Sequence, residues 1–396
     1  MKTNILVTGI VVATVGAVLV YPSIRGNAAV TPPLHHIVAP VGAKRVEVVF
    51  VLDTTGSMGG LIHAAKEKIW SIASTLAQAQ QAPEISMGLV AYRDRGDAYV
   101  TQVVDLNRDL DSMYVKLMDF AADGGGAGPE AVNQALDAAI NRMSWSQDQS
   151  TYKVVFLVGD APPHMDYQDD AKYQQVVATA AAKGIIVNTI QCGSMSDTVA
   201  PWREIAALGH GRYFTVEQAG SAVAIETPFD SRIATLAAEL DGTRLFYGTA
   251  EQQAAMAAKV DATARLNEEA SVAARARRGA FNVSSAGEAN LLGERELVDD
   301  VASGKVALEA LAPSQLPASV AALPPEARGE ALAETAQKRE DLKRQIADLA
   351  AQRDAYIETQ VDASGGAAAS LDQQIYDAVR EQAAPLGLEY EDGPRF

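Results

Sequence analysis

The sequence has a single cysteine, Cys192, among 396 residues. One cysteine cannot form an intramolecular disulfide, and it cannot build a zinc or iron–sulfur site that needs several thiolates. Histidines are also few, since only five are scattered along the chain and none belongs to an HExxH pair. These shortages argue against a structural zinc site. A chain of this length can nevertheless bury a sizeable core without disulfides.

Basic residues are in the minority. The chain carries 33 Lys and Arg against 50 Asp and Glu, a formal net charge of −17. Proteins that bind nucleic acid draw much of their affinity from clustered Lys and Arg, so this balance disfavours a nucleic-acid partner. It also disfavours adhesion to an anionic membrane surface. The same balance suits binding of cations or of a basic partner.

The first residues have the pattern of an export signal. An uncharged, mostly apolar run of sixteen residues, 5–20, ends at Tyr21-Pro22. It is shorter than the ~20 residues of a membrane span, and the small residues at 26–28 offer a cleavage site. We therefore expect residues 1–28 to be a cleaved signal peptide, or else an uncleaved inner-membrane anchor around residues 5–21. Both predictions place the rest of the chain outside the cytoplasm, in the periplasm or secreted.

An alternation of short apolar runs and helical patterns follows a proline-containing linker over residues 29–43. The apolar runs predict strands over 46–52, 85–92, 99–104, 154–158, 185–191 and 212–216. Helices are expected over 60–79, 109–120, 129–143, 168–183 and 198–208. Thr101 and Gln102 make the third run partly polar, so we expect it at a sheet edge. The pattern predicts an α/β fold over residues 44–225, with a doubly wound, mostly parallel six-stranded sheet.

The character of the sequence changes at about residue 226, and we expect an α-helical region over 226–396. Strand-like runs disappear, and helices are predicted over 229–240, 249–277, 295–311, 326–361 and 371–385. The apolar stripe of the longest helix is interrupted by Thr335, Arg339 and Arg353. We therefore favour an antiparallel helical hairpin over a long coiled coil. The dense basic cluster over residues 275–278 is expected at a solvated helix end.

Polar residues follow two of the predicted strands. Asp53, Thr55 and Ser57 come directly after the first strand, and Asp160 comes after the fourth. Loops at the carboxyl ends of parallel strands form the binding crevice of such a sheet. A glycine-rich loop over residues 123–130 lies between them in the sequence and allows close approach of the backbone. Oxygen donors alone suit Mg²⁺ or Mn²⁺, and such a site leaves coordination positions open to an incoming carboxylate.

This constellation resembles the von Willebrand factor type A domain. Asp53, Thr55 and Ser57 match that family's D-x-S/T-x-S metal-ion-dependent adhesion motif (MIDAS), and Asp160 matches its distal aspartate. The resemblance covers residues 44–217, and the motifs DTTGSM, GGGxxPE and VGDAPPHMDY are similar to those of a bacterial branch. It implies a module that binds a protein partner through a divalent ion, with an acidic side chain of the partner entering the open coordination position.

The sequence departs from this family at Ala127. The family supplies a Thr or an Asp from the middle loop, whereas Ala127 has no side-chain oxygen. Asp123 or Glu130 is a candidate substitute ligand. The alternative hypothesis is a structural or assembly protein with a degenerate metal site, in which Asp53 and Asp160 only cap loops and helices.

A third hypothesis, a haloacid-dehalogenase-like hydrolase, fits less well. That family carries D-x-D in the first loop, and its second Asp serves as acid and base. Thr55 stands at this second position, and the glycine-rich loop lacks the G-K-[ST] of a nucleotide-binding P-loop. We therefore expect no enzymatic activity. Two further features have ordinary interpretations: His164 fixes its loop by hydrogen bonds, and the tripeptide Arg95-Gly96-Asp97 is not an adhesion signal.

Overall fold

The computed structural model describes residues 44–60, 62–126, 128–216, 225–363 and 371–390. The predicted export signal and linker, Ala127, and the ends of the chain lie outside these ranges. None of the helices within the described ranges has both the length and the apolar character needed to cross a membrane.

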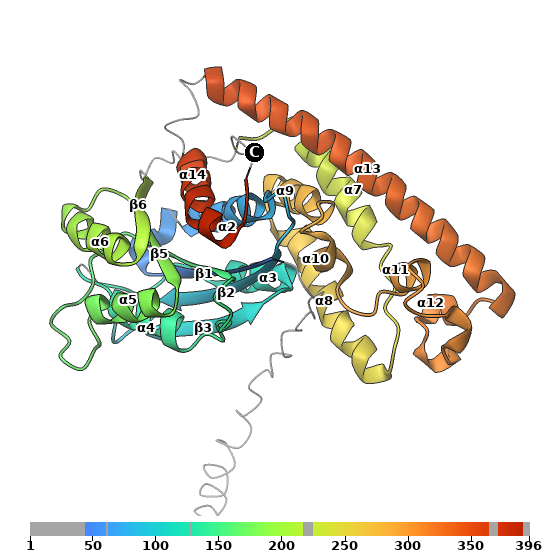
Figure 1. Ribbon diagram of the computed structural model, residues 1–396, viewed down its shortest axis with the longest axis horizontal. Coiled ribbons are helices and arrows are strands. Elements are labelled where there is room, and N and C mark those ends of the chain that lie inside the picture. Colours follow the sequence, from blue (N-terminus) through green and yellow to red (C-terminus); the bar gives the residue numbers. More distant parts are fainter. Residues whose placement is uncertain (1–43, 61, 127, 217–224, 364–370, 391–396) are drawn as a thin grey trace, which may run out of the picture. The chain divides into compact units, whose positions relative to one another are not determined.

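Six strands form one sheet in the order β3-β2-β1-β4-β5-β6 (Figure 1). The strands are β1 (Arg45–Asp53), β2 (Glu84–Tyr92), β3 (Thr101–Asn107), β4 (Tyr152–Gly159), β5 (Ile185–Cys192) and β6 (His210–Val216). All neighbours pair in parallel except β2 and β3, which are antiparallel. The predicted fold class is confirmed, and β3 is an edge strand as expected. The central strand β1 is buried along all but its first residue, as its run of Val, Phe and Leu predicts.

Helices from the same part of the chain pack against the sheet. They are α2 (Ile62–Ala77), α3 (Leu110–Asp119), α4 (Val132–Asn141), α5 (Tyr173–Ala182) and α6 (Ser196–Leu208). One core cluster joins α4, α5 and α6 to inward-facing residues such as Val49 and Val51 of β1. The alternate residue Phe50 points to the other face, where its ring stacks on Phe156 at 5.7 Å. The sheet is therefore covered on both faces, as a parallel sheet requires.

The helical region has more breaks than the sequence predicted. It contains α7 (Asp230–Asp241), α8 (Ala250–Glu269), α9 (Val272–Asn282), α10 (Glu288–Leu292), α11 (Leu297–Ala302), α12 (Ala318–Ala321), α13 (Pro325–Ala363) and α14 (Leu371–Ala383). The helix expected over 249–277 is two helices, because Ser271 caps α9 by accepting a hydrogen bond from the Ala274 N–H at 3.0 Å. The helix expected over 295–311 ends at Ala302, and only a 3₁₀ turn follows over Leu308–Ala310.

The long helix α13 is a single helix of 39 residues that packs against α7, α9 and α11. In a helical hairpin, α13 would pack along the helix next to it in the sequence, whereas these three partners come from earlier in the chain. The hairpin prediction is therefore wrong for α13. The arginines that interrupt its apolar stripe are buried in ion pairs. Arg339 donates to both carboxylate oxygens of Glu296 at 2.8 and 2.9 Å, and Arg353 donates to Asp230 at 2.8 Å. These pairs explain how polar residues occupy the packed side of the helix.

The helix α14 returns to the sheet domain, where it packs on α2 and β6 (Figure 1). Its Gln382 accepts a hydrogen bond from the Tyr152 hydroxyl at 2.8 Å and donates to Asn188 at 2.9 Å. Farther along, the Tyr390 hydroxyl donates to the Leu76 carbonyl oxygen at 3.2 Å. A helix from the far end of the chain thus helps to cover the sheet.

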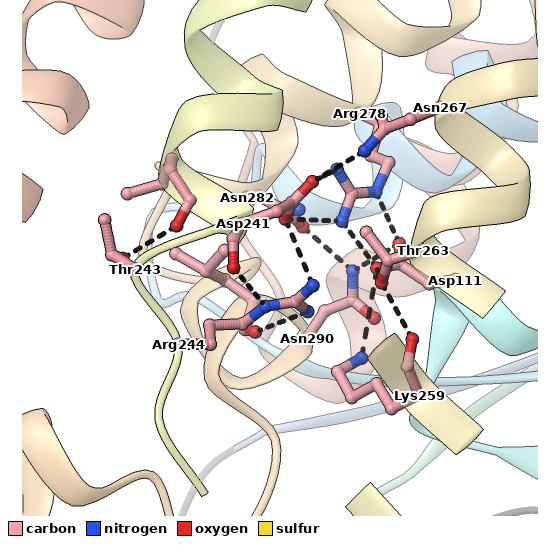
Figure 2. Close-up of polar contacts among 12 residues, drawn as sticks. Asp111, Asp241, Thr243, Arg244, Lys259, Thr263, Asn267, Arg278, Asn282 and Asn290 are labelled. Atoms are coloured by element: carbon pink, nitrogen blue, oxygen red, sulfur yellow. Dashed lines mark hydrogen bonds and ion pairs between the residues drawn. The ribbon is translucent and has the colours of Figure 1, made fainter. Parts of the chain in front are cut away.

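A buried polar network joins α3 to the helical region (Figure 2). Arg278 of α9 is 1% exposed and donates to Asp111 of α3 at 2.6 and 2.7 Å. It also donates to Asp241 at the end of α7, at 2.8 and 2.9 Å. Lys259 of α8 donates to Asp109, the N-cap of α3, at 2.5 Å. The prediction of a solvated basic cluster is therefore wrong for Arg278, because carboxylates from two other helices compensate its charge.

Candidate metal centre

The predicted ligands from the first and fourth strands meet at one edge of the sheet. Asp53, the last residue of β1, is fully buried. Its Oδ1 accepts hydrogen bonds from the Thr55 N–H at 2.9 Å and the Thr55 hydroxyl at 2.6 Å. The Thr55 Oγ1 lies 3.1 Å from the Ser57 Oγ, and the Ser57 hydroxyl donates to Asp160 at 3.1 Å. The two hydroxyls therefore bring the carboxylates of Asp53 and Asp160 together, although their two protons can make only two of these three hydrogen bonds.

Glycines allow the strands and loops to approach closely here. A β-carbon at Gly159, the last residue of β4, would lie 2.8 Å from the β-carbon of Asp53 and would collide with the Tyr92 hydroxyl. A β-carbon at Gly56 would lie 2.9 Å from the Gly124 carbonyl oxygen. That oxygen accepts a hydrogen bond from the Gly56 N–H at 3.0 Å. The motif loop and the glycine-rich loop are therefore held together through their backbones.

The glycine-rich loop binds a carboxylate that the sequence did not mark. Gly124 and Gly125 both have positive φ, 69° and 74°. The Gly125 N–H donates to both carboxylate oxygens of Asp97, each at 3.0 Å. Asp97 belongs to the Arg95-Gly96-Asp97 tripeptide, and Arg95 contacts Asp170 at 2.6 Å. Both charged side chains of the tripeptide thus serve the fold, and spacing could not reveal a contact between residues 28 positions apart.

The two candidate substitute ligands occupy different environments. The side chain of Asp123 is 81% exposed, and its nearest charged partner is Arg93 at 3.6 Å. Glu130 is 2% exposed. Its Oε1 lies 3.3 Å from the position that a β-carbon on Gly125 would take, and the β-carbon of Thr55 lies 2.8 Å from the same position. Glu130 therefore lies on the Thr55 side of the site, whereas Asp123 points to solvent.

Buried acids gather at the site, and their surroundings favour the protonated form of each. Burial, with a smaller contribution from the charge of Asp160, raises the pKa of Asp53 to about 7. Burial and the charge of Asp53 raise the pKa of Glu130 to about 9, and burial also raises the pKa of Asp160. Within the described residues, Asp53 Oδ2, Glu130 Oε2 and the Tyr92 hydroxyl are buried without a hydrogen-bond partner. Buried acids without partners are costly, so the site fits a cation.

The donor set fits a hard divalent ion. Carboxylates and hydroxyls supply oxygen only, which suits Mg²⁺ or Mn²⁺. Among the residues that the structure describes, no three His, Cys, Asp or Glu side chains are grouped closely enough to hold a metal ion by themselves. The hydroxyls of Thr55 and Ser57 are therefore needed beside the carboxylates of Asp53 and Asp160.

His164 lies in the loop after Asp160 and is occupied there. Its Nδ1 lies 2.7 Å from Asp166 Oδ1, and its Nε2 lies 3.2 Å from Asp94 Oδ2. Its ring stacks on Tyr167 with 4.0 Å between centroids. The expected role of His164 in fixing its loop agrees with these contacts.

Known proteins share the sheet domain. Residues 47–228 match the family model of the von Willebrand factor A domain. This segment is a von Willebrand factor A domain. The chain is 36% identical over 114 residues to von Willebrand factor A domain-containing protein 7 of Rattus norvegicus, and the matched segment covers 29% of this chain and 12% of that protein. It is 25% identical over 159 residues to a putative ariadne-like RING finger protein of Acanthamoeba polyphaga mimivirus, and the matched segment covers 39% of this chain and 14% of that protein.

Solved structures of von Willebrand factor A proteins are similar to less than half of the chain. Proximal thread matrix protein 1 of the mussel byssus, with a zinc-occupied MIDAS motif, is 14% identical, with a TM-score of 0.36 over 45% of this chain and 43% of that chain. A von Willebrand factor type A protein from Catenulispora acidiphila is 20% identical, with a TM-score of 0.34 over 45% of this chain and 40% of that chain. The chain spans only 12% and 14% of the lengths of the two curated relatives named above.

Proposed function

We propose that this von Willebrand factor A domain binds a protein partner through Mg²⁺ or Mn²⁺. Asp53, Thr55, Ser57 and Asp160 would hold the ion. Glu130, buried on the Thr55 side, would add negative charge and not a ligand oxygen, because no three acids among the described residues are close enough to hold an ion together. The observation that carries the proposal is the set of buried acids at one edge of the sheet, two of which have an oxygen without a partner among the described residues. We further propose that the partner is met outside the cytoplasm, because the first residues have the pattern of an export signal.

The side chains at such a site have two roles: some carry the charge that binds the ion, and others orient those charged groups. A bound divalent ion offers a coordination position to an acidic side chain of the partner. Asp53 and Asp160 bring two negative charges to one place, and the hydrogen bonds through Thr55 and Ser57 fix how these carboxylates are oriented. Because Asp53 ends a strand that is buried along all but its first residue, its position is set before any ion arrives.

Binding fits these residues better than catalysis. Ser57 is hydrogen-bonded to Thr55 and Asp160, and within the described site no histidine is placed to accept its proton. His164 is engaged with Asp94 and Asp166 instead. We therefore propose that the chain is a binding module and not a hydrolase.

The test is a thermal melt of the full chain in chelator and in millimolar Mg²⁺ or Mn²⁺. An ion that binds only the folded state adds about 2.7 kcal/mol of stability at a hundredfold excess over its dissociation constant. We expect Asp53→Ala to abolish the rise in melting midpoint. Glu130→Gln should reduce the rise, whereas the matched variant Asp123→Asn should leave it unchanged because Asp123 faces solvent.

One observation favours the alternative, an assembly protein that needs no ion. Asp53 and Asp160 each accept a hydrogen bond from a hydroxyl, that of Thr55 and that of Ser57, without a cation. This hypothesis predicts equal melting midpoints in chelator and in Mg²⁺. That result, or an equal rise in Asp53→Ala and the wild type, would reject the metal-dependent function.

A further inference from the structure

The two edges of the sheet carry opposite charge. The carboxyl edge consists of the β1 end with its loop and of four further loops, residues 53–60, 93–100, 120–131, 160–172 and 193–195. These segments contain nine Asp or Glu against three Lys or Arg, a net charge of −6. The opposite edge, residues 44, 78–83, 108–109, 142–151 and 183–184, contains four Lys or Arg against two Asp, a net charge of +2. Within the sheet domain, the acidity is therefore concentrated around the candidate metal centre.

The rim of this edge is accessible to a macromolecule. The side chains of Asp123, Asp166 and Asp169 are 81%, 71% and 72% exposed. Met165 and Met195, in the loops after β4 and β5, are among the few large apolar side chains that the described surface exposes, at 46% and 42%. Exposed methionines are typical of surfaces that adapt to a partner.

Buried groups beneath the rim point to a cation as well. Among the residues that the structure describes, Asp53 Oδ2 and Glu130 Oε2 have no hydrogen-bond partner, and Glu130 and Asp53 are at most 2% exposed. The acidic rim therefore surrounds a site in which these two carboxylate oxygens are open to a cation. Counted with every acid ionised, the edge has a net charge of −6, and one divalent ion leaves it at −4, so the edge stays negative when the site is filled.

We propose that the partner surface is basic and presents its metal-binding carboxylate among Lys or Arg side chains. This inference rests on the proposed function, and it specifies the partner that the site selects. A carboxylate in an acidic segment would bring further negative charge within the screening length, about 8 Å at physiological salt, of the exposed rim aspartates. A carboxylate flanked by basic residues reaches the ion and pairs its flanks with the same aspartates.

Three labelled peptides test the inference by fluorescence anisotropy with the full chain. They are Lys-Lys-Ala-Asp-Ala-Lys-Lys, its counterpart with Glu in place of every Lys, and the Lys peptide with Asn in place of Asp. In Mg²⁺ we expect the Lys-flanked Asp peptide to bind at least about tenfold more tightly than the Glu-flanked peptide. The difference should shrink at high salt. Chelator should weaken the Lys-flanked Asp peptide to the level of its Asn counterpart.

Two double variants that remove the same charge distinguish an effect of the rim aspartates from an effect of the net charge of the chain. The double variant Asp166→Asn with Asp169→Asn should reduce the preference for the Lys-flanked peptide about fivefold. The control, Glu330→Gln with Glu334→Gln, removes the same charge from exposed positions on α13 and should leave the preference unchanged.

Three results would overturn the inference. The first is that the Glu-flanked peptide binds as tightly as the Lys-flanked one. The second is that neither peptide binds in Mg²⁺, and the third is that the Asn peptide binds as tightly as the Asp peptide. In each case, a melting midpoint that still rises with Mg²⁺ leaves the metal-dependent function standing. A midpoint that does not respond to Mg²⁺ or Mn²⁺ removes that function and the partner inference together.

Discussion

Replacing Arg278 by Met tests the buried network most directly. Its guanidinium donates four hydrogen bonds, two to Asp111 and two to Asp241. Methionine keeps the apolar part of the side chain and removes the charge, so both carboxylates lose their main partner. Removing one member of a buried ion pair costs about 3–5 kcal/mol. This is a large share of the roughly 5–15 kcal/mol by which native proteins are stable.

The assay is urea denaturation of the full chain, followed by circular dichroism. The control is Arg344→Met, because Arg344 is 69% exposed and pairs with Asp341 at the surface of α13. Such a pair contributes about 0–1 kcal/mol. We expect Arg278→Met to lower the free energy of unfolding several times more than Arg344→Met. Adding Asp111→Asn to Arg278→Met should restore part of the loss, since one unpaired charge disappears. Equal losses in the two single variants would refute the argument.

Two further predictions concern the metal centre. Burial holds the pKa of Asp53 at about 7 and that of Glu130 at about 9, so the folded chain binds more protons than the unfolded chain above pH ~4. In chelator, the free energy of unfolding should therefore fall as the pH rises from about 5 to 9. Mg²⁺ should remove this fall by stabilising the ionised acids. Melting midpoints that do not change with pH in chelator would contradict the prediction. Gly159→Ala should lower stability by about 1–3 kcal/mol and weaken the Mg²⁺-dependent rise in melting midpoint, because its methyl group displaces Asp53. Gly59→Ala, where a β-carbon meets nothing within 4 Å, is the control, and equal behaviour of the two variants would exclude this mechanism.

The sheet domain could be predicted because its signals are local. Runs of Val and Ile mark strands that are buried on both faces, and Thr101 and Gln102 mark the edge strand. The positions of Asp53 and Asp160 at strand ends also follow from the pattern, since parallel strands bring their carboxyl ends to one edge. These signals do not depend on contacts between distant segments.

The helical region was harder because its decisive contacts are distant in sequence. Arg278 meets an aspartate 167 positions away, and Arg339 meets a glutamate 43 positions away. Each arginine resembles a surface residue until its partner is placed beside it. The different environments of Asp123 and Glu130 depend likewise on how the glycine-rich loop folds over Thr55. Sequence spacing treats those two acids as equals, whereas burial separates them.

The position of α14 has a consequence for the synthesis of this chain. The helix buries Leu371, Ile375, Tyr376 and Val379 as it covers α2 and β6. Residues 217–370, 154 in number, separate it from the end of β6. At about 5–20 residues per second, a ribosome needs about 8–30 seconds to make that stretch. The growing chain thus holds a nearly finished sheet with one apolar surface uncovered throughout this interval. Products that stop before α14 keep that surface exposed.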